Sequence, residues 1–344
     1  MRLTQLIWKH YREQLVKNNP GGKGQAPFFT AGNLVLIVTS RCNFLCKHCL
    51  RNFDSGRDLS LDIAKKALLG AKRYKFRHMS LTGGEPLVYP HLKELIEFAV
   101  NNGYKFAIVT NGYNLNEVGD LLKKYRPSIS FIAFSLESVD KKKHDAQRRE
   151  GSFERLLEDF QFCRKNKIPF RVLTAASLMN YDEIFDLALF AKKKGAQCLA
   201  VTTILPCPRS EDNKLVLDAG RRQELFLLLK QLPHIIKLPV VIAADLRAPG
   251  NIKLCQALDM VEITVDMDGN LVQCCELANF DSEDIRRHAI ITSLTDKSFD
   301  DALKILSEHS HKSGVQRIED FKTQADLEHI DFNSCFYCLR KLTA

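Results

Sequence analysis

The sequence predicts an α/β protein, a partial (β/α)6 TIM-like barrel with a small C-terminal α+β unit. Short apolar runs alternate with amphipathic helical patterns from Asn33 onward, as in parallel sheets covered by helices. Cysteines, glycines and acidic residues follow directly after several of these runs, and parallel barrels carry their chemistry at such strand ends. A later Asp-Gly pair between two apolar runs indicates a β-hairpin outside the barrel.

Six strands are expected in the barrel, at residues 34–38, 79–81, 106–109, 129–136, 170–175 and 198–204. Helical patterns lie between them at residues 60–74, 91–102, 153–165 and 181–194. Gly103 and Gly195 are consistent with two of these helices. Each lies just after the predicted end of a helix, where a residue in the left-handed conformation commonly terminates it. Six such units predict a barrel that is open on one side.

Two further segments flank the barrel. Residues 3–17 carry an apolar stripe that predicts an amphipathic helix, and a glycine-rich linker follows. Toward the other end, strands at 262–265 and 271–273 flank the Asp268-Gly269 turn, and a helix is expected near 299–309. The expected parts are therefore an N-terminal helix and linker (1–30), the barrel (31–248) and a smaller C-terminal domain (249–344).

The composition bounds the function. The 344-residue chain has no apolar segment as long as a membrane span, and its first residues lack the apolar core of a signal peptide, so a cytoplasmic protein is expected. In that compartment its eleven cysteines indicate metal ligation rather than disulfides. The net charge of +9 fits an acidic substrate or electron donor. Nucleic acid is not expected, because the basic residues are spread along helices rather than clustered with aromatic ones.

Cys42, Cys46 and Cys49 form a C-x3-C-x2-C motif just past the first predicted strand. A [4Fe–4S] cluster is normally held by four thiolates, so three in one loop leave one iron open to another ligand. Structural zinc is the alternative, with His48 as a fourth ligand. We favour the cluster, because His48 leaves the loop in a different direction from its neighbour Cys49 and no second zinc knuckle lies nearby.

A second motif, Gly83-Gly84-Glu85-Pro86, follows the second predicted strand at the same barrel mouth. The glycines would let the backbone approach a ligand closely, and a buried Glu85 would offer an acceptor to a cation. With both motifs in place, the chain resembles the radical S-adenosylmethionine (SAM) superfamily. This resemblance implies that SAM chelates the open iron and that a reduced cluster cleaves it to a 5′-deoxyadenosyl radical, which abstracts a substrate hydrogen atom. It also implies a flavodoxin- or ferredoxin-type electron donor.

The resemblance assigns further SAM contacts to the ends of later strands. Thr110 and Asn111 end the third strand, Ser135 and Glu137 end the fourth, and they would contact the ribose and the methionyl carboxylate; Glu137 stands where the family commonly has Asp. Arg148 resembles the arginine that reaches the SAM carboxylate, with Arg149 an equal alternative. Leu205, after the sixth strand, would lie near the adenine.

The C-terminal cysteines resemble the SPASM and twitch extensions of this superfamily. Cys255, Cys274, Cys335 and Cys338 would hold one auxiliary [4Fe–4S] cluster in the shorter twitch arrangement, because only six residues follow Cys338. A four-cysteine zinc site is the alternative. Cys275 stands beside Cys274, and since adjacent residues of a strand face opposite sides, only one of the two should be a ligand.

Three other cysteines have separate interpretations. Cys163 and Cys198 are expected in the core, because each lies in an apolar pattern. Cys207 follows the sixth strand between two prolines, at the expected barrel mouth. Its thiol is a candidate hydrogen-atom donor to a substrate radical, and an ordinary loop cysteine is the alternative.

The resemblance leaves the substrate class open. The first hypothesis is modification of a peptide, by crosslinking, epimerisation or oxidation, in natural-product maturation; against it, residues 1–30 are too few to form a leader-peptide-binding domain. The second is a small-molecule dehydrogenase or rearrangement enzyme in cofactor or antibiotic biosynthesis. A non-enzymatic iron–sulfur carrier or zinc-held binding module is the third, and the Gly83–Pro86 motif argues against it.

Overall fold

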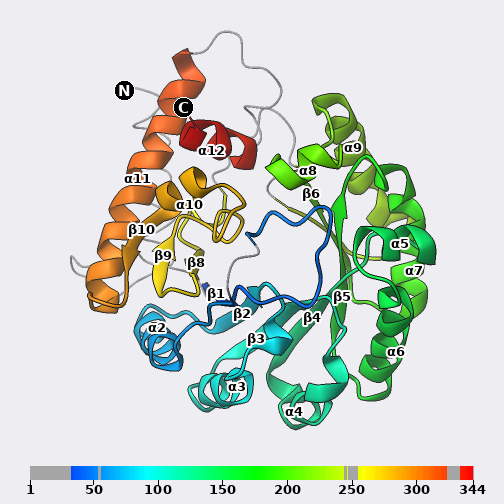
Figure 1. Ribbon diagram of the computed structural model, residues 1–344, viewed down its shortest axis with the longest axis horizontal. Helices are drawn as coiled ribbons and strands as arrows, with labels where there is room; N and C mark the ends of the chain where they lie inside the picture. The colour runs from blue at the N-terminus through cyan, green and yellow to red at the C-terminus, as the bar shows by residue number, and fades with distance from the viewer. Residues whose placement is uncertain (1–31, 53–55, 244–245, 247–254, 324–333, 344) are drawn as a thin grey trace.

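The computed structural model describes residues 32–52, 56–243, 246, 255–323 and 334–343. A single sheet of ten strands, in the order β10-β9-β8-β1-β2-β3-β4-β5-β6-β7, curves into a horseshoe that is open between its two edges (Figure 1). Strands β1 to β7 are parallel, which confirms the predicted partial barrel. Their bounds are β1 Asn33–Thr39, β2 His78–Gly83, β3 Lys105–Thr110, β4 Ile129–Ser135, β5 Phe170–Ala176, β6 Leu199–Thr203 and β7 Val240–Ile242.

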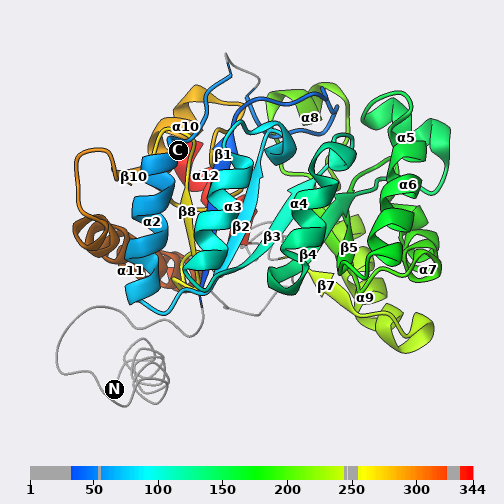
Figure 2. The same cartoon turned by 90° about the horizontal axis from the view of Figure 1, so that it is seen from below.

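Helices cover the outer face of the horseshoe (Figure 2). They are α2 Leu61–Arg73, α3 Leu92–Asn101, α4 Gly119–Lys124, α5 Lys141–Gln147, α6 Ser152–Lys165, α7 Ile184–Lys194 and α9 Ala219–Ile236, whereas the short helix α8 Pro208–Asp212 lies at the carboxyl ends of the strands. The sequence reading missed β7, because a run of three residues after Pro239 is too short to stand out. The predicted helix at residues 3–17 lies outside the described residues.

The C-terminal strands extend the barrel sheet. The predicted hairpin is present as β8 Glu262–Val265 and β9 Asn270–Val272, and β10 Ile290–Ser293 pairs with β9. Strand β8 pairs in parallel with β1, so the hairpin and the barrel share one sheet. Helices α10 Glu283–Ala289, α11 Phe299–Thr323 and α12 Ser334–Thr343 complete this side. Helix α11 contacts α2, where Phe299 fills the space that a side chain at Gly70 would need.

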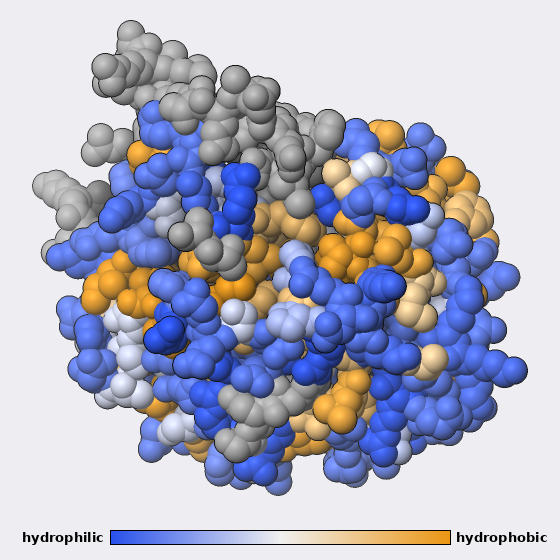
Figure 3. All heavy atoms as spheres, turned by 45° about the horizontal axis from the view of Figure 1, so that its top comes forward, coloured by the Kyte–Doolittle hydropathy of each residue, from blue (hydrophilic) through white to orange (hydrophobic). Residues whose placement is uncertain are grey.

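On β5 and β6 the two faces of the sheet differ in burial. On β5, Val172 and Thr174 point outward and are fully buried against the helices, whereas Leu173 and Ala175 point inward and are only half-buried. Strand β6 repeats this alternation. A closed barrel fills its interior with side chains, so half-buried inner positions show that solvent reaches this inner face. On the side toward which the horseshoe opens, apolar side chains gather near the centre and hydrophilic ones surround them (Figure 3).

Candidate functional site

The loop after β1 lies across the carboxyl ends of the neighbouring strands and carries Cys42, Cys46 and Cys49 (Figure 2). Backbone hydrogen bonds pin it in place. The N–H groups of Gly84 and Glu85 donate to the carbonyls of Thr39 and Arg41, both at 2.8 Å. On the far side, the N–H of Lys47 donates to the carbonyl of Gln147 at 3.0 Å. The loop is therefore held between the ends of β1 and β2 and the end of α5.

The three thiols of this loop lie in a largely desolvated setting. Burial raises the pKa of Cys42 to about 12 and that of Cys46 to about 11, and it raises the pKa of Cys49 as well. Two of the sulfurs accept hydrogen bonds, Cys42 from the N–H of Phe44 at 3.4 Å and Cys46 from Arg148 at 3.8 Å. Three sulfur ligands, two of which accept N–H hydrogen bonds, fit an iron–sulfur cluster, because such hydrogen bonds tune its thiolates.

Gly83 and Gly84 are needed where two backbones cross. A Cβ at position 84 would lie 2.1 Å from the carbonyl oxygen of Arg41, and one at position 83 would lie 2.4 Å from that of Thr39. Gly83 also has a φ of +148°, which residues with a side chain rarely adopt. The sequence reading explained these glycines by close approach to a ligand. In the structure their close approach is to the cysteine loop itself.

Glu85 is 1% exposed, and its carboxylate is used within the protein. It accepts hydrogen bonds from the hydroxyl of Thr110 at 2.6 Å, the N–H of Asn111 at 2.8 Å and the N–H of Leu87 at 3.0 Å. Asn111 in turn donates from its side-chain amide to Asn43 in the cysteine loop at 2.8 Å. Glu85 thus ties the ends of β2 and β3 together, and its predicted contact with a bound cation stays a prediction.

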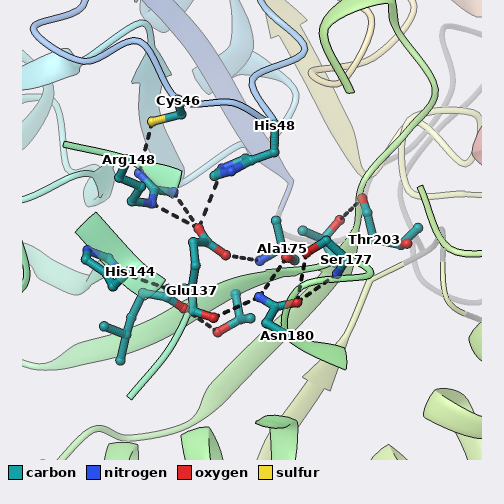
Figure 4. Close-up of polar contacts among 12 residues, drawn as sticks. Cys46, His48, Glu137, His144, Arg148, Ala175, Ser177, Asn180 and Thr203 are labelled. Carbon is teal, nitrogen blue, oxygen red and sulfur yellow. Dashed lines mark hydrogen bonds and ion pairs between the residues drawn. The ribbon is translucent and has the colours of Figure 1, made fainter. Parts of the chain in front are cut away.

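Glu137 and Arg148 form a buried ion pair beside Cys46 (Figure 4). Two nitrogens of Arg148 donate to one oxygen of Glu137, at 2.7 and 3.0 Å, and the other oxygen accepts the N–H of Ala175 at 3.0 Å. Burial raises the pKa of Glu137, but the charge and hydrogen bonds of Arg148, together with the nearby histidines, outweigh burial and the net shift is downward. The remaining guanidinium nitrogen points at the sulfur of Cys46. The pair therefore places a fixed positive charge next to a cysteine of the loop.

We expect Arg148→Met to destabilise the protein by about 3–5 kcal/mol, because it leaves Glu137 buried without its partner. Urea unfolding followed by circular dichroism measures this. The matched control is Arg73→Met, which breaks the exposed pair with Asp300 and should change the midpoint little. Equal losses in the two variants would contradict the assignment.

Two buried histidines flank this ion pair. His48 Nε2 lies 3.6 Å from the Glu137 carboxylate, and His144 Nδ1 accepts the backbone N–H of Glu137 at 3.1 Å. Burial lowers the pKa of each to about 4, so both are neutral at pH 7. Asn180 holds the same strand end, since its amide donates to the Glu137 carbonyl at 2.8 Å. The sequence reading weighed His48 only as a zinc ligand; in the structure its Nε2 faces Glu137.

Arg149 and Ser135, also predicted to contact SAM, occupy different settings. Arg149 stacks over the rings of Tyr113 and Phe44, at 4.4 and 5.7 Å from their centroids, and donates to the Asn43 carbonyl at 3.0 Å. It therefore braces the cysteine loop from outside. Ser135 is buried at the end of β4. The structure brings Arg148, rather than Arg149, to the cysteines.

The predicted auxiliary cysteines line one cavity of the C-terminal side. Cys255, Cys274, Cys335 and Cys338 all border it, although 83 positions separate the first from the last. Burial raises the pKa of Cys338 to about 12 and that of Cys274 well above its ordinary value, and neighbouring thiols add to both shifts. The side-chain amide of Gln273 donates to the sulfur of Cys338 at 3.4 Å. Among the described residues, no three Cys, His, Asp or Glu side chains converge on a point where one metal ion would sit.

Cys275 lies on the opposite side of the chain from Cys274. It packs with Val35, Ile37 and Met267 on the inner side of β1, away from the cavity. Of the two adjacent cysteines, the structure brings Cys274 to the other three.

Leu205 and Cys207 lie between the two cysteine groups. Leu205 borders the C-terminal cavity, which it shares with Cys274 and Leu277, so its predicted contact with adenine stays a prediction. Cys207 is 3% exposed, and its sulfur lies 3.9 Å from the carbonyl oxygen of Cys49. Its thiol is thus packed against the cysteine loop, and its role as a hydrogen-atom donor stays a prediction.

Comparisons with known proteins bear on the barrel. Residues 36–191 match the radical SAM superfamily. The AdoMet-dependent heme synthase of Methanosarcina barkeri is 28% identical over 187 residues, 53% of this chain and 53% of its own length. The antilisterial bacteriocin subtilosin biosynthesis protein AlbA of Bacillus subtilis is 28% identical over 179 residues, 51% of this chain and 40% of its own length. The chain therefore spans about half the length of these curated relatives.

Among solved structures, Streptococcus suis SuiB bound to the precursor peptide SuiA superimposes with a TM-score of 0.65 at 16% identity. The superposition covers 87% of this chain and 68% of SuiB. At that identity the likeness concerns the fold. Among the described residues, no helix combines the length and apolar character needed to cross a membrane.

Proposed function

We propose that this chain is a radical SAM enzyme, because residues 36–191 match that superfamily, and that it modifies a peptide by crosslinking, epimerising or oxidising a residue. Cys42, Cys46 and Cys49 would hold the [4Fe–4S] cluster, and SAM would bind beside them. When bound, these groups supply a 5′-deoxyadenosyl radical that removes a hydrogen atom from an unactivated C–H bond. We further propose that the protein works in the cytoplasm with a flavodoxin- or ferredoxin-type donor.

One observation carries the proposal of an extended substrate. The inner positions of β5 and β6, such as Leu173, Ala175 and Thr202, are half-buried, and among the described residues the sheet does not close between its edge strands β7 and β10. The cysteine loop lies at the rim of this inner face. A chain lying along the face would therefore reach the radical source at one end, which suits a peptide.

The chain's own residues would orient and tune the bound groups. Arg148 would donate to the ligating sulfur of Cys46 and hold a positive charge beside it. Glu85, through Thr110 and Asn111, would fix the ends of β2 and β3 against the cysteine loop. Desolvation around the three thiols would keep water from a reactive radical.

The relatives agree with this proposal without deciding it. AlbA is named for the biosynthesis of a bacteriocin, and SuiB was solved with its precursor peptide. The relative named as a heme synthase favours a second candidate, a small-molecule dehydrogenase or rearrangement enzyme. Both candidates need the same radical source, so only the substrate separates them.

Hydrogen transfer from a deuterated extract separates the two. The reconstituted protein, SAM and dithionite are mixed with a perdeuterated cell extract that has been split by size, and deuterium in 5′-deoxyadenosine is read by mass spectrometry. We expect the label to come from the peptide-sized fraction and to vanish after protease treatment. Label from the small-molecule fraction that survives protease treatment would favour the second candidate instead.

We also propose that the C-terminal side is a twitch-type unit with one auxiliary [4Fe–4S] cluster, held by Cys255, Cys274, Cys335 and Cys338. Their shared cavity supports this. Four thiolates leave no open iron, so such a cluster suits electron transfer rather than substrate binding.

Replacing Cys338 by Ala should lower the iron content of the reconstituted protein from about eight to about four per chain. Cys275→Ala is the matched control, because Cys275 is the partly buried residue next to Cys274 and faces away from the cavity, and this variant should keep about eight. Iron and acid-labile sulfide assays measure both. Zinc bound at the cavity in place of iron would contradict the auxiliary cluster.

A further inference from the structure

Arg171 is a charged side chain on the inner face of the barrel. On β5 it alternates with the outward residues Phe170 and Val172, which are buried against the helices. It therefore shares the inner face with Leu173 and Ala175. In the register of the two strands, Arg171 pairs with Ala133 of β4, so these two residues are neighbours on the inner face.

Among the described residues, the guanidinium of Arg171 has a stacking partner but no anionic partner. It lies over the ring of Phe131 on β4, 3.7 Å from the centroid, and its Nε is buried without a hydrogen-bond partner. Among the described residues, none forms an ion pair with it. Arg171 is half-buried, and partial desolvation of a charge without a counter-charge is unfavourable, a cost that the stack offsets only in part. A guanidinium held flat in this way presents its N–H groups as a fixed fork, the geometry that binds a carboxylate through two hydrogen bonds.

Arg171 lies at the other end of β5 from the barrel mouth, at a distance from the cysteine loop. Arg171 stands four residues before Ala175, whose N–H reaches the Glu137 carboxylate at the barrel mouth. At 3.3 Å of rise per residue the separation along β5 is about 13 Å. A group held by Arg171 would therefore belong to a part of the substrate several bonds away from the reacting carbon.

We propose that Arg171, stacked on Phe131, binds a carboxylate of the substrate and so fixes how far the peptide extends along the inner face. The proposal rests on the proposed peptide-modifying function and narrows it to peptides with an acidic side chain or a free C-terminus about three to four residues from the modified position, since an extended chain rises about 3.3 Å per residue. Arg171 is thus a specificity-determining residue, away from the reacting atoms.

Protection from phenylglyoxal tests the proposal without turnover. The reconstituted protein with SAM is labelled anaerobically in the presence of one of two capped tetrapeptide pools, identical except that one position is Asp or Glu in the first and Asn or Gln in the second. Tryptic mass spectrometry follows Arg171, with the exposed Arg126 on the outer surface as internal reference. We expect the acidic pool to slow labelling of Arg171 at least about threefold more than the amide pool, with Arg126 unchanged.

Equal protection by the two pools, or stronger protection by inorganic phosphate than by the acidic pool, would overturn the carboxylate assignment. Affinity for the acidic pool gives a second readout, for which we expect a loss of at least about tenfold in Arg171→Met and a smaller loss in Arg171→Lys, which keeps the charge but not the fork. Unchanged affinity in both variants would also overturn it. Failure of the peptide function itself is seen separately, in the deuterium-transfer experiment, and leaves the labelling result intact.

Discussion

Cys46→Ala is expected to lower the formation of 5′-deoxyadenosine from SAM by at least about 1,000-fold, equivalent to about 4 kcal/mol in the activation barrier. The reason is the ligand count. A cubane cluster with one open iron already has only three protein thiolates, so removing one leaves too few to hold it. Cys46 is also the cysteine that accepts the hydrogen bond from Arg148, so its loss removes both a ligand and the contact that orients it.

The measurement combines anaerobic reconstitution, iron analysis and chromatography of the SAM products. Cys163→Ala is the matched control, because Cys163 is a fully buried core thiol of α6 with no place in either cysteine group. It should keep its iron and its SAM cleavage. If Cys46→Ala retained a normal iron content and cleaved SAM, the loop would not be the cluster site.

Gly84→Ala is expected to destabilise the protein by about 3 kcal/mol or more and to prevent loading of the first cluster. The added Cβ would meet the Arg41 carbonyl oxygen at 2.1 Å, and backbone cannot rotate away as a side chain can. Relief requires the loop after β1 to move off the end of β2, which breaks the hydrogen bonds from Gly84 and Glu85. The three cysteines of the loop would then no longer be held at the barrel mouth in the positions needed to bind the cluster.

Urea unfolding and iron content measure this effect together. Gly220→Ala is the control, because its added Cβ would meet only the side-chain end of Asp218, at 3.3 Å, within α9. That variant should differ from wild type by less than about 1 kcal/mol and load iron normally. A Gly84→Ala protein as stable and as iron-rich as the Gly220→Ala protein would show that the two backbones do not cross as described.

The sequence predicted the sheet and the first site well, for local reasons. Strand and helix periodicity identified six parallel strands, and the loop cysteines lie within eight consecutive residues, so their proximity needs no knowledge of the fold. The roles of Gly84 and Glu85 were less accessible. The sequence located both residues at the barrel mouth. However, a glycine that lets a ligand approach and a glycine that lets another backbone approach look the same in the sequence, and only the contact with Arg41 shows which of the two Gly84 is.

By itself, then, the sequence determined that this chain has a partial α/β barrel with a cysteine triad at its mouth, because strand period and motif spacing are encoded within a few neighbouring residues. Only the tertiary structure decided that four distant cysteines share one cavity, that β8 pairs with β1, and that Arg148 rather than Arg149 reaches Cys46. The same holds for Arg171 on the inner face, whose Nε is buried and has no hydrogen-bond partner in the part of the chain that the structure describes. These contacts join residues far apart in the chain, and which of them meet depends on strand register and helix packing, which local spacing does not specify.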